Sequence, residues 1–168
     1  MVIIRWRINN LEGYESVFGY LVIYSIMTVG TFGVLLSLTN ANYISDLSFL
    51  RKSNPTLAVS FTFILFSLAG IPPLAGFFAK FYLFFAVLSS SYYLVAIIGI
   101  LTSCISCFYY LRLIKVMYFS QSNWISYDQM SRSQALLIST SVFALFLVFL
   151  FPNVVYTSLK LALLVNTF

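Results

Sequence analysis

Residues 68–81 read LAGIPPLAGFFAKF, and this stretch decides the fold. Two adjacent prolines, Pro72 and Pro73, lie between Gly70 and Gly76, and Lys80 follows in the same apolar run. Each proline lacks an amide donor, and the residue before a proline is pushed out of the α-helical region. A helix that enters this stretch is therefore expected to break at residues 70–76.

The whole chain has the composition of an integral membrane protein. Of its 168 residues, 61% are hydrophobic and only 8% are charged, and the mean hydropathy is +0.99. A soluble domain carries many more charges. The net charge of +5 comes from residues clustered between apolar runs, which indicates loops at the surface of a lipid bilayer and argues against nucleic-acid binding. The expected fold class is an all-α, polytopic membrane protein with a single membrane domain over residues 1–168.

Four apolar segments are long enough for the ~20 residues of a membrane-crossing helix. The expected crossings are residues 18–38, 57–88, 92–118 and 135–151. The second would be about 48 Å long as one helix, too long for one hydrocarbon core of about 30 Å and too short for two crossings. We therefore predict four transmembrane helices, the second broken at mid-membrane. A tail over residues 154–165 is expected at the interface or as a tilted helix end.

The expected topology follows from alternation of the four crossings. The termini would share one side of the membrane, and basic residues are more numerous on the other side, which the positive-inside rule places in the compartment equivalent to the cytoplasm. The basic residues on the side of the termini are Arg5, Arg7 and Lys160. The basic residues on the other side are Arg51, Lys52, Arg112, Lys115 and Arg132.

Small residues indicate where helices pack closely. Four small residues of the first segment, Ser25, Thr28, Gly30 and Gly33, are of the kind that lets transmembrane backbones approach, so we expect this segment at helix contacts. Cys104 and Cys107 form a C-x-x-C in SCISCFYY, but thiolates inside an apolar segment would be costly. We expect them at a helix–helix contact, without redox chemistry. The chain has no histidine, and its four carboxylates lie outside the apolar runs, so no metal site is expected.

Of the nine basic residues, eight lie in loops or at the ends of the expected helices, and only Lys80 lies within an apolar run, between FFA and FYLFFAVL. A lysine near the bilayer centre costs about 2.5–3.5 kcal/mol on insertion scales, and such a residue usually marks an ion or proton pathway. The alternative is a lysine that pairs with a carboxylate of a neighbouring subunit for assembly alone. Irregular backbone at membrane depth is either buried in protein or lines a hydrated cavity, and of the two we expect a hydrated cavity rather than a packing kink. The half-helix after Gly76 would also bring its positive dipole end close to Lys80.

Three stretches resemble a known family. SLAGIPPLAGFFAKF at residues 67–81, FYYLRLIKVMYF at 108–119 and GYESVFGYLVIYSIMTVGTFGVLLSL at 13–38 are similar to NADH dehydrogenase subunit 2, an antiporter-like subunit of respiratory complex I. The first motif is the most specific, because the related subunit 4 typically has glutamate in place of Lys80 and subunit 5 typically has aspartate in place of Phe81.

The resemblance implies that the four helices are the last four of a fourteen-helix subunit, and that Lys80 takes part in proton translocation on its broken twelfth helix. It implies no cofactor in this chain, since NADH, FMN, iron–sulfur clusters and ubiquinone would be bound by other subunits of complex I. The chain lacks the preceding helices of the family, so it is expected to be either a fragment or one half of a subunit encoded in two pieces. Its start methionine and polar leader RWRINNLEGYES favour one half of a split subunit, with a separate chain supplying the N-terminal helices.

Two other functions stay open at this point. The chain could be part of a multisubunit cation/proton antiporter, or a structural membrane-arm subunit without transport. The expected location is the mitochondrial inner membrane, because so apolar a chain without a presequence suits synthesis inside the organelle, and the alternative is a bacterial plasma membrane.

Overall fold

The computed structural model describes residues 2–38, 43–72, 74–120, 130–153, 156–158 and 160–161, with side chains from residue 13 onward. The described residues form helices and no strand. The helices are α1 (Val2–Ser37), the 3₁₀ helix η1 (Ile44–Phe49), α2 (Leu50–Ser53), α3 (Pro55–Ala69), α4 (Ala75–Ser89), α5 (Tyr93–Phe119) and α6 (Arg132–Leu150). The all-helical class is therefore confirmed for this part of the chain.

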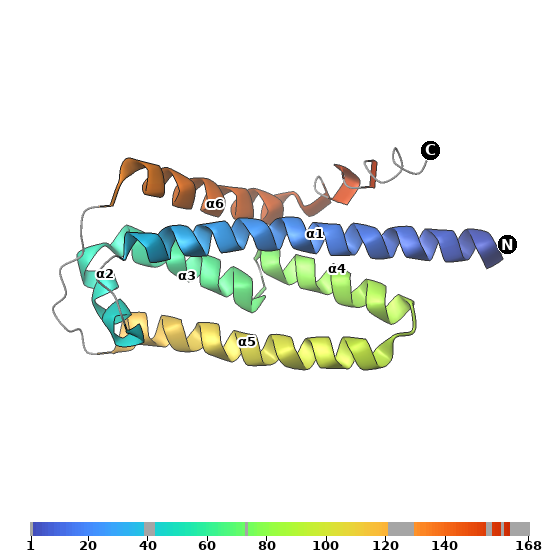
Figure 1. Ribbon diagram of the computed structural model, residues 1–168, viewed down its shortest axis with the longest axis horizontal. Coiled ribbons are helices and arrows are strands. Elements are labelled where there is room, and N and C mark those ends of the chain that lie inside the picture. Colours follow the sequence, from blue (N-terminus) through green and yellow to red (C-terminus); the bar gives the residue numbers. More distant parts are fainter. Residues whose placement is uncertain are drawn as a thin grey trace.

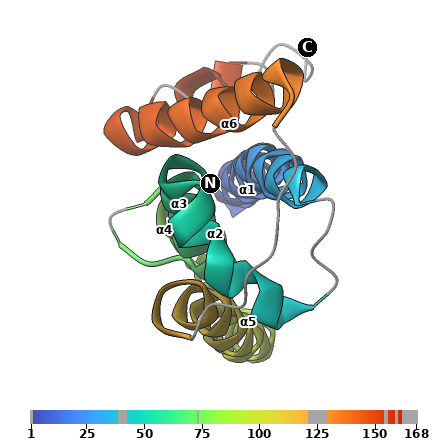
Figure 2. The same ribbon diagram turned by 90° about the vertical axis from the view of Figure 1, so that its left-hand side faces the viewer.

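The long helices lie side by side along one axis (Figure 1). Helices α3 and α4 follow one another between α1 and α5, so that together they have about the reach of a single long helix. Helix α6 packs on α1, and α1 in turn packs on α3 and α4. Seen from the end, α6 forms one outer layer, α1 and α3 the middle, and α5 the other outer layer (Figure 2). The N-terminal end of α1 and the C-terminal end of α6 point toward the same end of the bundle.

Three of the helices are long and apolar enough to cross a membrane: Gly13–Ser37 within α1, Tyr93–Phe119 and Arg132–Leu150. Helices α3 and α4 have 15 residues each. At 1.5 Å per residue each is only about 22 Å long, less than a hydrocarbon core. The chain is therefore a multi-pass membrane protein in which one pair of short helices lies where a single crossing was expected.

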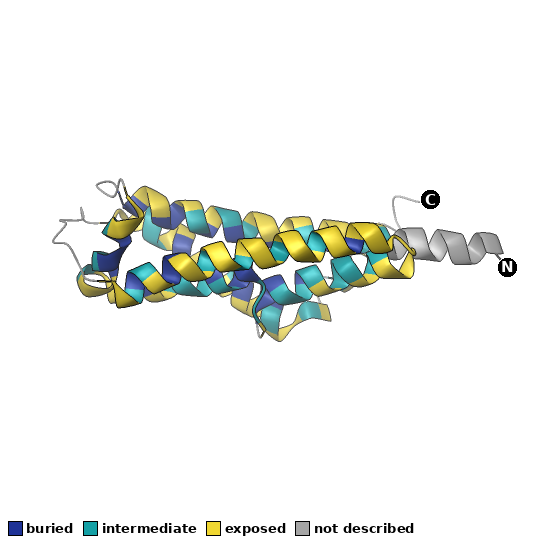
Figure 3. Cartoon of the chain, turned by 90° about the horizontal axis from the view of Figure 1, so that it is seen from below, coloured by how far each residue is buried: buried dark blue, intermediate teal, exposed yellow. Residues whose placement is uncertain are grey.

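The outer face of α5 is apolar and is not covered by the other residues that the structure describes. Leu94, Ile105 and Phe108 are each more than 70% exposed, and Figure 3 shows this helix as mostly exposed along its length. Such a continuous apolar face is compatible with lipid or with another transmembrane helix, and not with water.

The interior contact between α1, α3 and α6 depends on small residues. A Cβ atom at Gly30 would lie 2.9 Å from Ile64 Cδ1 and 3.0 Å from Ser141 Cβ. A Cβ at Gly33 would lie 3.2 Å from Ile138. The predicted packing role is confirmed for these two glycines, whereas Ser25 of the same segment is exposed and Thr28 is only partly buried. Around them lie the fully buried side chains of the core, Ile23, Met27, Val34, Phe61, Ile64, Leu65 and Leu145.

Several boundaries differ from those expected. The first helix begins well before residue 18, and the segment between the first two expected crossings contains η1 and α2. Asp46 organises η1, because its carboxylate accepts a hydrogen bond from the Tyr43 amide at 2.8 Å. Helix α6 begins at Arg132 rather than 135, because Ser131 and Gln134 form a capping box.

Of the tail expected at 154–165, residues 156–158 and 160–161 are described, and they are helical. The side chains of Arg5 and Arg7 and the segment 121–129 lie outside the described part.

Candidate functional site

The break between α3 and α4 is shorter than expected and spans residues 70–74. Gly70 ends α3 in a left-handed conformation, with φ 79° and ψ 37°. Its amide donates to the carbonyls of Phe66 and Ser67, and the Ile71 amide donates to Phe66 at 3.2 Å. A positive φ is unfavourable for residues with a Cβ atom, so glycine fits this turn best. Pro72 lies in the turn that follows, and Pro73 lies outside the described residues.

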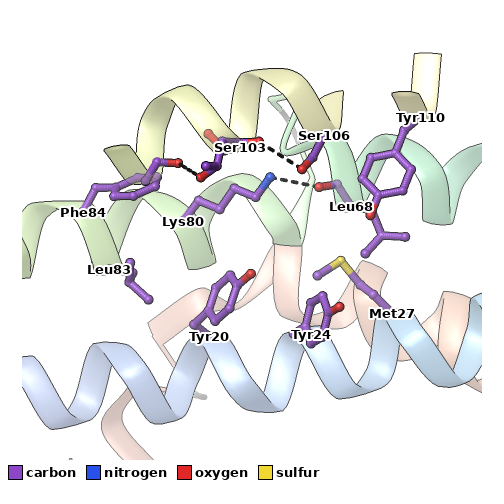
Figure 4. Close-up of a pocket in the computed structure, with 12 residues that line it drawn as sticks. Tyr20, Tyr24, Met27, Leu68, Lys80, Leu83, Phe84, Ser103, Ser106 and Tyr110 are labelled. Atoms are coloured by element: carbon purple, nitrogen blue, oxygen red, sulfur yellow. Dashed lines mark hydrogen bonds between the residues drawn. The ribbon is translucent and has the colours of Figure 1, made fainter. Parts of the chain in front are cut away.

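The Lys80 amine occupies the C-terminal end of α3. It donates hydrogen bonds to the carbonyl oxygens of Leu68 at 2.9 Å and Ala69 at 3.2 Å. These carbonyls belong to the last turn of α3, where helical partners are missing. The amine therefore satisfies two backbone acceptors, and a cation at this position also interacts favourably with the negative end of the helix dipole. Figure 4 shows the lysine reaching back from α4 toward Leu68.

This placement adds to one expectation. The amine was expected near the positive end of α4, and the structure shows that its hydrogen-bond partners lie on the negative end of α3. The physical reason is the left-handed turn at Gly70, which redirects the chain so that the Lys80 side chain can lie across the end of α3. A Cβ atom at Gly70 would lie 3.0 Å from Lys80 Cδ and 3.2 Å from its Nζ. Gly70 thus provides both the turn and the space for the lysine side chain.

Gly76 lies in the first turn of α4, where it touches α3 directly. A Cβ atom there would lie 1.8 Å from the Ser67 carbonyl oxygen, which is sterically impossible without separating the helices. The Gly76 amide donates to the Ser67 hydroxyl oxygen at 3.1 Å. Ser67 is fully buried. The sequence analysis placed Gly76 among the helix-breaking residues, and the structure instead gives it close contact between the two short helices.

One side of Lys80 borders a cavity of about 380 Å³ lined by many hydroxyl groups. Tyr20 and Tyr24 approach from α1, and their rings stack with centroids 5.8 Å apart. Figure 4 shows Lys80 between these tyrosines and the serines of α5. A cavity of this size has room for several water molecules, and its hydroxyl groups are potential hydrogen-bond partners for them. The hydroxyl-bearing residues that line it are Tyr20, Tyr24, Thr102, Ser103, Ser106 and Tyr110.

The other side of Lys80 borders an open groove of about 450 Å³ between α4 and α5. Four phenylalanines of α4 line it, together with Cys104 and Cys107 of α5. Both thiols are free, and Cys104 is exposed. The cysteines were expected at a helix–helix contact, but within the described residues they face this groove. No cluster of three or more potential metal-ligating His, Cys, Asp or Glu residues occurs in the described part of the chain.

Sequence reasoning missed two parts of this site. Ser67 resembles an ordinary helical serine, and only its place just before Gly70 could have drawn attention to it. The tyrosines of α1 are far from Lys80 in sequence. Their spacing of four residues puts them on one helix face, but nothing in the sequence shows that this face meets Lys80.

Comparison with known proteins matches this chain to a protein family and to similar sequences. Residues 1–106 match the family described as NADH:quinone oxidoreductase/Mrp antiporter, TM. NADH-ubiquinone oxidoreductase chain 2 of Marchantia polymorpha is 45% identical over 155 residues, which cover 90% of this chain and 32% of that protein. NADH-quinone oxidoreductase subunit N of Rhodospirillum rubrum is 43% identical over 167 residues, covering 95% of this chain and 34% of that protein.

A solved structure has the same arrangement of helices. A chain of respiratory complex I from Thermus thermophilus with bound aureothin superposes with a TM-score of 0.77 at 25% sequence identity, over 86% of this chain and 34% of that one. The chain therefore spans about one third of the length of the proteins it resembles. With a family match over more than half of its residues, the chain belongs to the membrane subunits of the NADH:quinone oxidoreductase/Mrp antiporter family.

Proposed function

We propose that this chain is part of the antiporter-like subunit 2 of a respiratory complex I and helps to move protons across the membrane while other subunits transfer electrons from NADH to ubiquinone. The observation that carries the proposal is the Lys80 amine at a helix break, between a hydroxyl-lined cavity and an open groove. The complex I names of the relatives support this assignment over a cation/proton antiporter.

Lys80 would act as a proton carrier. An amine can gain and lose a proton, and the hydroxyl-lined cavity offers a place where water could deliver or accept it. The carbonyls of Leu68 and Ala69 fix the amine at the edge of that cavity. Broken helices that hold ion sites near the midplane recur in transporters, because their free backbone groups replace water as ligands. In this account the chain itself carries no cofactor and no redox centre.

The proposed topology has four crossings, with α3 and α4 together forming the second. The support is the arrangement in Figure 1, in which these two helices follow one another alongside α1. The ends of the bundle then differ in charge. Arg51, Lys52 and Arg132 lie at the end opposite the N-terminus of α1, which would face the matrix of a mitochondrion. A bacterial plasma membrane would place the same end in the cytoplasm.

The helices that fill the remaining two thirds of the relatives would have to be present in the working complex. We propose that a separate chain supplies them and packs against the exposed apolar face of α5. Support comes from the share of each relative that this chain covers and from the exposure of Leu94, Ile105 and Phe108. The mass of this chain in the purified complex would decide between a separate partner and a longer version of the same polypeptide.

The function is tested by replacing Lys80 with methionine or with arginine in the assembled complex. Methionine removes the donor and the titratable amine. Arginine keeps donors for the α3 carbonyls but does not release its proton in a protein. Both variants should lose most NADH–quinone turnover that is coupled to proton transport, while arginine should preserve assembly better. Normal coupled turnover in either assembled variant would contradict the proposal and favour a structural subunit without transport.

A further inference from the structure

Lys80 and Ser67 cap each other's helices across the break. Lys80 extends from α4 and binds the last carbonyls of α3, at Leu68 and Ala69. Ser67 extends from α3 and accepts a hydrogen bond from the Gly76 amide in the first turn of α4. Both ends of the break are therefore satisfied by a side chain from the opposite half-helix, and the two contacts begin from adjacent residues, Ser67 and Leu68.

Ser67 caps the start of α4, where the N-cap residue of that helix does not. Leu74 occupies the N-cap position of α4, and its apolar side chain makes no capping hydrogen bond. The first amides of a helix need acceptors from outside the helix, and Ser67, fully buried, is the side chain that provides one for Gly76. Gly76 can approach Ser67 this closely because it has no Cβ atom, for which there would be no room against the Ser67 carbonyl.

The register of α4 links this cap to Lys80. Gly76 and Lys80 are four residues apart in one helix, so they lie on the same face, one turn from each other. Anchoring Gly76 to Ser67 therefore fixes the height and rotation of the helix face that carries the lysine. A change of the anchor would move the amine relative to the Leu68 and Ala69 carbonyls.

We propose that Ser67 is a positioning residue, whose hydroxyl sets the start of α4 and thereby holds the Lys80 amine on the end of α3 and at the edge of the hydroxyl-lined cavity. This role rests on the proposed function of Lys80 in proton transfer. Ser67 itself exchanges no proton with a substrate. Its contribution is the geometry in which Lys80 does so.

The test compares Ser67→Ala with Ser141→Ala in the assembled complex reconstituted into lipid vesicles. Ser141 is also buried, but its hydroxyl donates only within its own helix, to Leu137 at 2.8 Å, so it controls for loss of a buried hydroxyl. NADH–quinone turnover is measured over a pH series, together with the amount of assembled complex. The other titratable groups that border the cavity and groove, Tyr20, Tyr24, Tyr110, Cys104 and Cys107, are the same in both variants.

Ser67→Ala should lower coupled turnover about three- to tenfold, the range expected for loss of one buried hydrogen bond. It should also move the pH of half-maximal turnover by about half a unit or more, because the surroundings of the amine change. Ser141→Ala should do neither. Unchanged turnover in Ser67→Ala would overturn the role, and so would lower turnover with an unmoved pH profile, since a purely structural defect gives that result.

If Ser67→Ala does not assemble, Ser67→Cys takes its place, because a thiol is similar in size and a weaker acceptor. A moved pH profile in that variant supports the role, and an unmoved profile overturns it. The Lys80→Met complex distinguishes a failure of the Ser67 role from a failure of the proposed function. If Lys80→Met abolishes pumping while Ser67→Ala resembles the control, only the role of Ser67 fails. If Lys80→Met pumps normally, the proposed function itself fails.

Discussion

The Lys80 nitrogen lies 2.9 Å from the carbonyl oxygen of Leu68, twelve residues earlier and on the other side of a helix break. This hydrogen bond joins the basic side chain in the middle of an apolar run to the buried C-terminal end of a membrane helix. It explains how a lysine and a broken backbone occur together in so apolar a stretch. Each provides what the other lacks, because the amine needs acceptors and the helix end needs donors.

Replacing Gly70 with alanine should destabilise the assembled complex. The left-handed conformation at this position disfavours a Cβ atom by about 1–2 kcal/mol, and the Lys80 side chain occupies the space that the new methyl group would need. We expect a lower thermal unfolding temperature and reduced coupled turnover. Gly13→Ala is the matched control, because a Cβ atom there has nothing within 4 Å. Equal stability of the two variants would contradict the turn described at Gly70.

Replacing Gly76 with alanine should be more severe. The new methyl group would overlap the Ser67 carbonyl, which is backbone and cannot rotate away. We expect little assembled complex on a native gel. Gly99→Ala is the comparison, since its Cβ atom would meet only the ring of Phe84, which can move. Normal assembly of the Gly76 variant would mean that α3 and α4 are not packed as described.

Much of this site could be predicted from the sequence, and the reasons are local. Adjacent prolines interrupt a helix in any context, and a lone lysine among apolar residues needs polar partners wherever it lies. The small residues Gly30 and Gly33 likewise predicted a close helix contact, which the structure confirms. Each of these inferences depends on a few neighbouring residues and on the properties of the bilayer.

The remaining features depend on contacts between distant residues. Which carbonyls accept hydrogen bonds from the Lys80 amine follows from the direction of the Gly70 turn, and the sequence analysis did not identify the end of α3 as their source. The capping role of Ser67 appears only when α4 is placed against α3. Cys104 was expected at a helix contact, but it is exposed. It lies on α5, whose apolar outer side is not covered by the described residues.

The topology can be tested with single cysteines in a chain whose Cys104 and Cys107 are replaced by serine. Ser45 and Ser131 are exposed near the end of the bundle that carries Arg51, whereas Ser90 is exposed at the opposite end. Four crossings predict that a membrane-impermeant maleimide labels Ser45→Cys and Ser131→Cys from the matrix or cytoplasmic side only. Ser90→Cys should react from the other side. Labelling of Ser45→Cys and Ser90→Cys from the same side would contradict α3 and α4 forming one crossing.

The hydroxyl-lined cavity should contribute to the rate of proton transfer. Thr102→Val keeps the side-chain volume but removes one polar group that could bind water, so coupled turnover should fall about two- to tenfold. Thr140→Val is the matched control, because its hydroxyl also bonds within its own helix but lies away from Lys80. Stopped-flow measurement of NADH oxidation would compare them, and equal rates would show that the cavity plays no part.

The central claim concerns Lys80 as a proton carrier, and the number of protons pumped per NADH oxidised measures it most directly. The Lys80→Arg complex is the informative variant, because it retains a cation and donors for Leu68 and Ala69 while losing a proton that can be released. With assembly equal to that of the unmodified complex, the account predicts that vesicles containing this variant acidify much less per NADH or that turnover stops. An assembled Lys80→Arg complex that pumps the unmodified number of protons per NADH at the unmodified rate would contradict it.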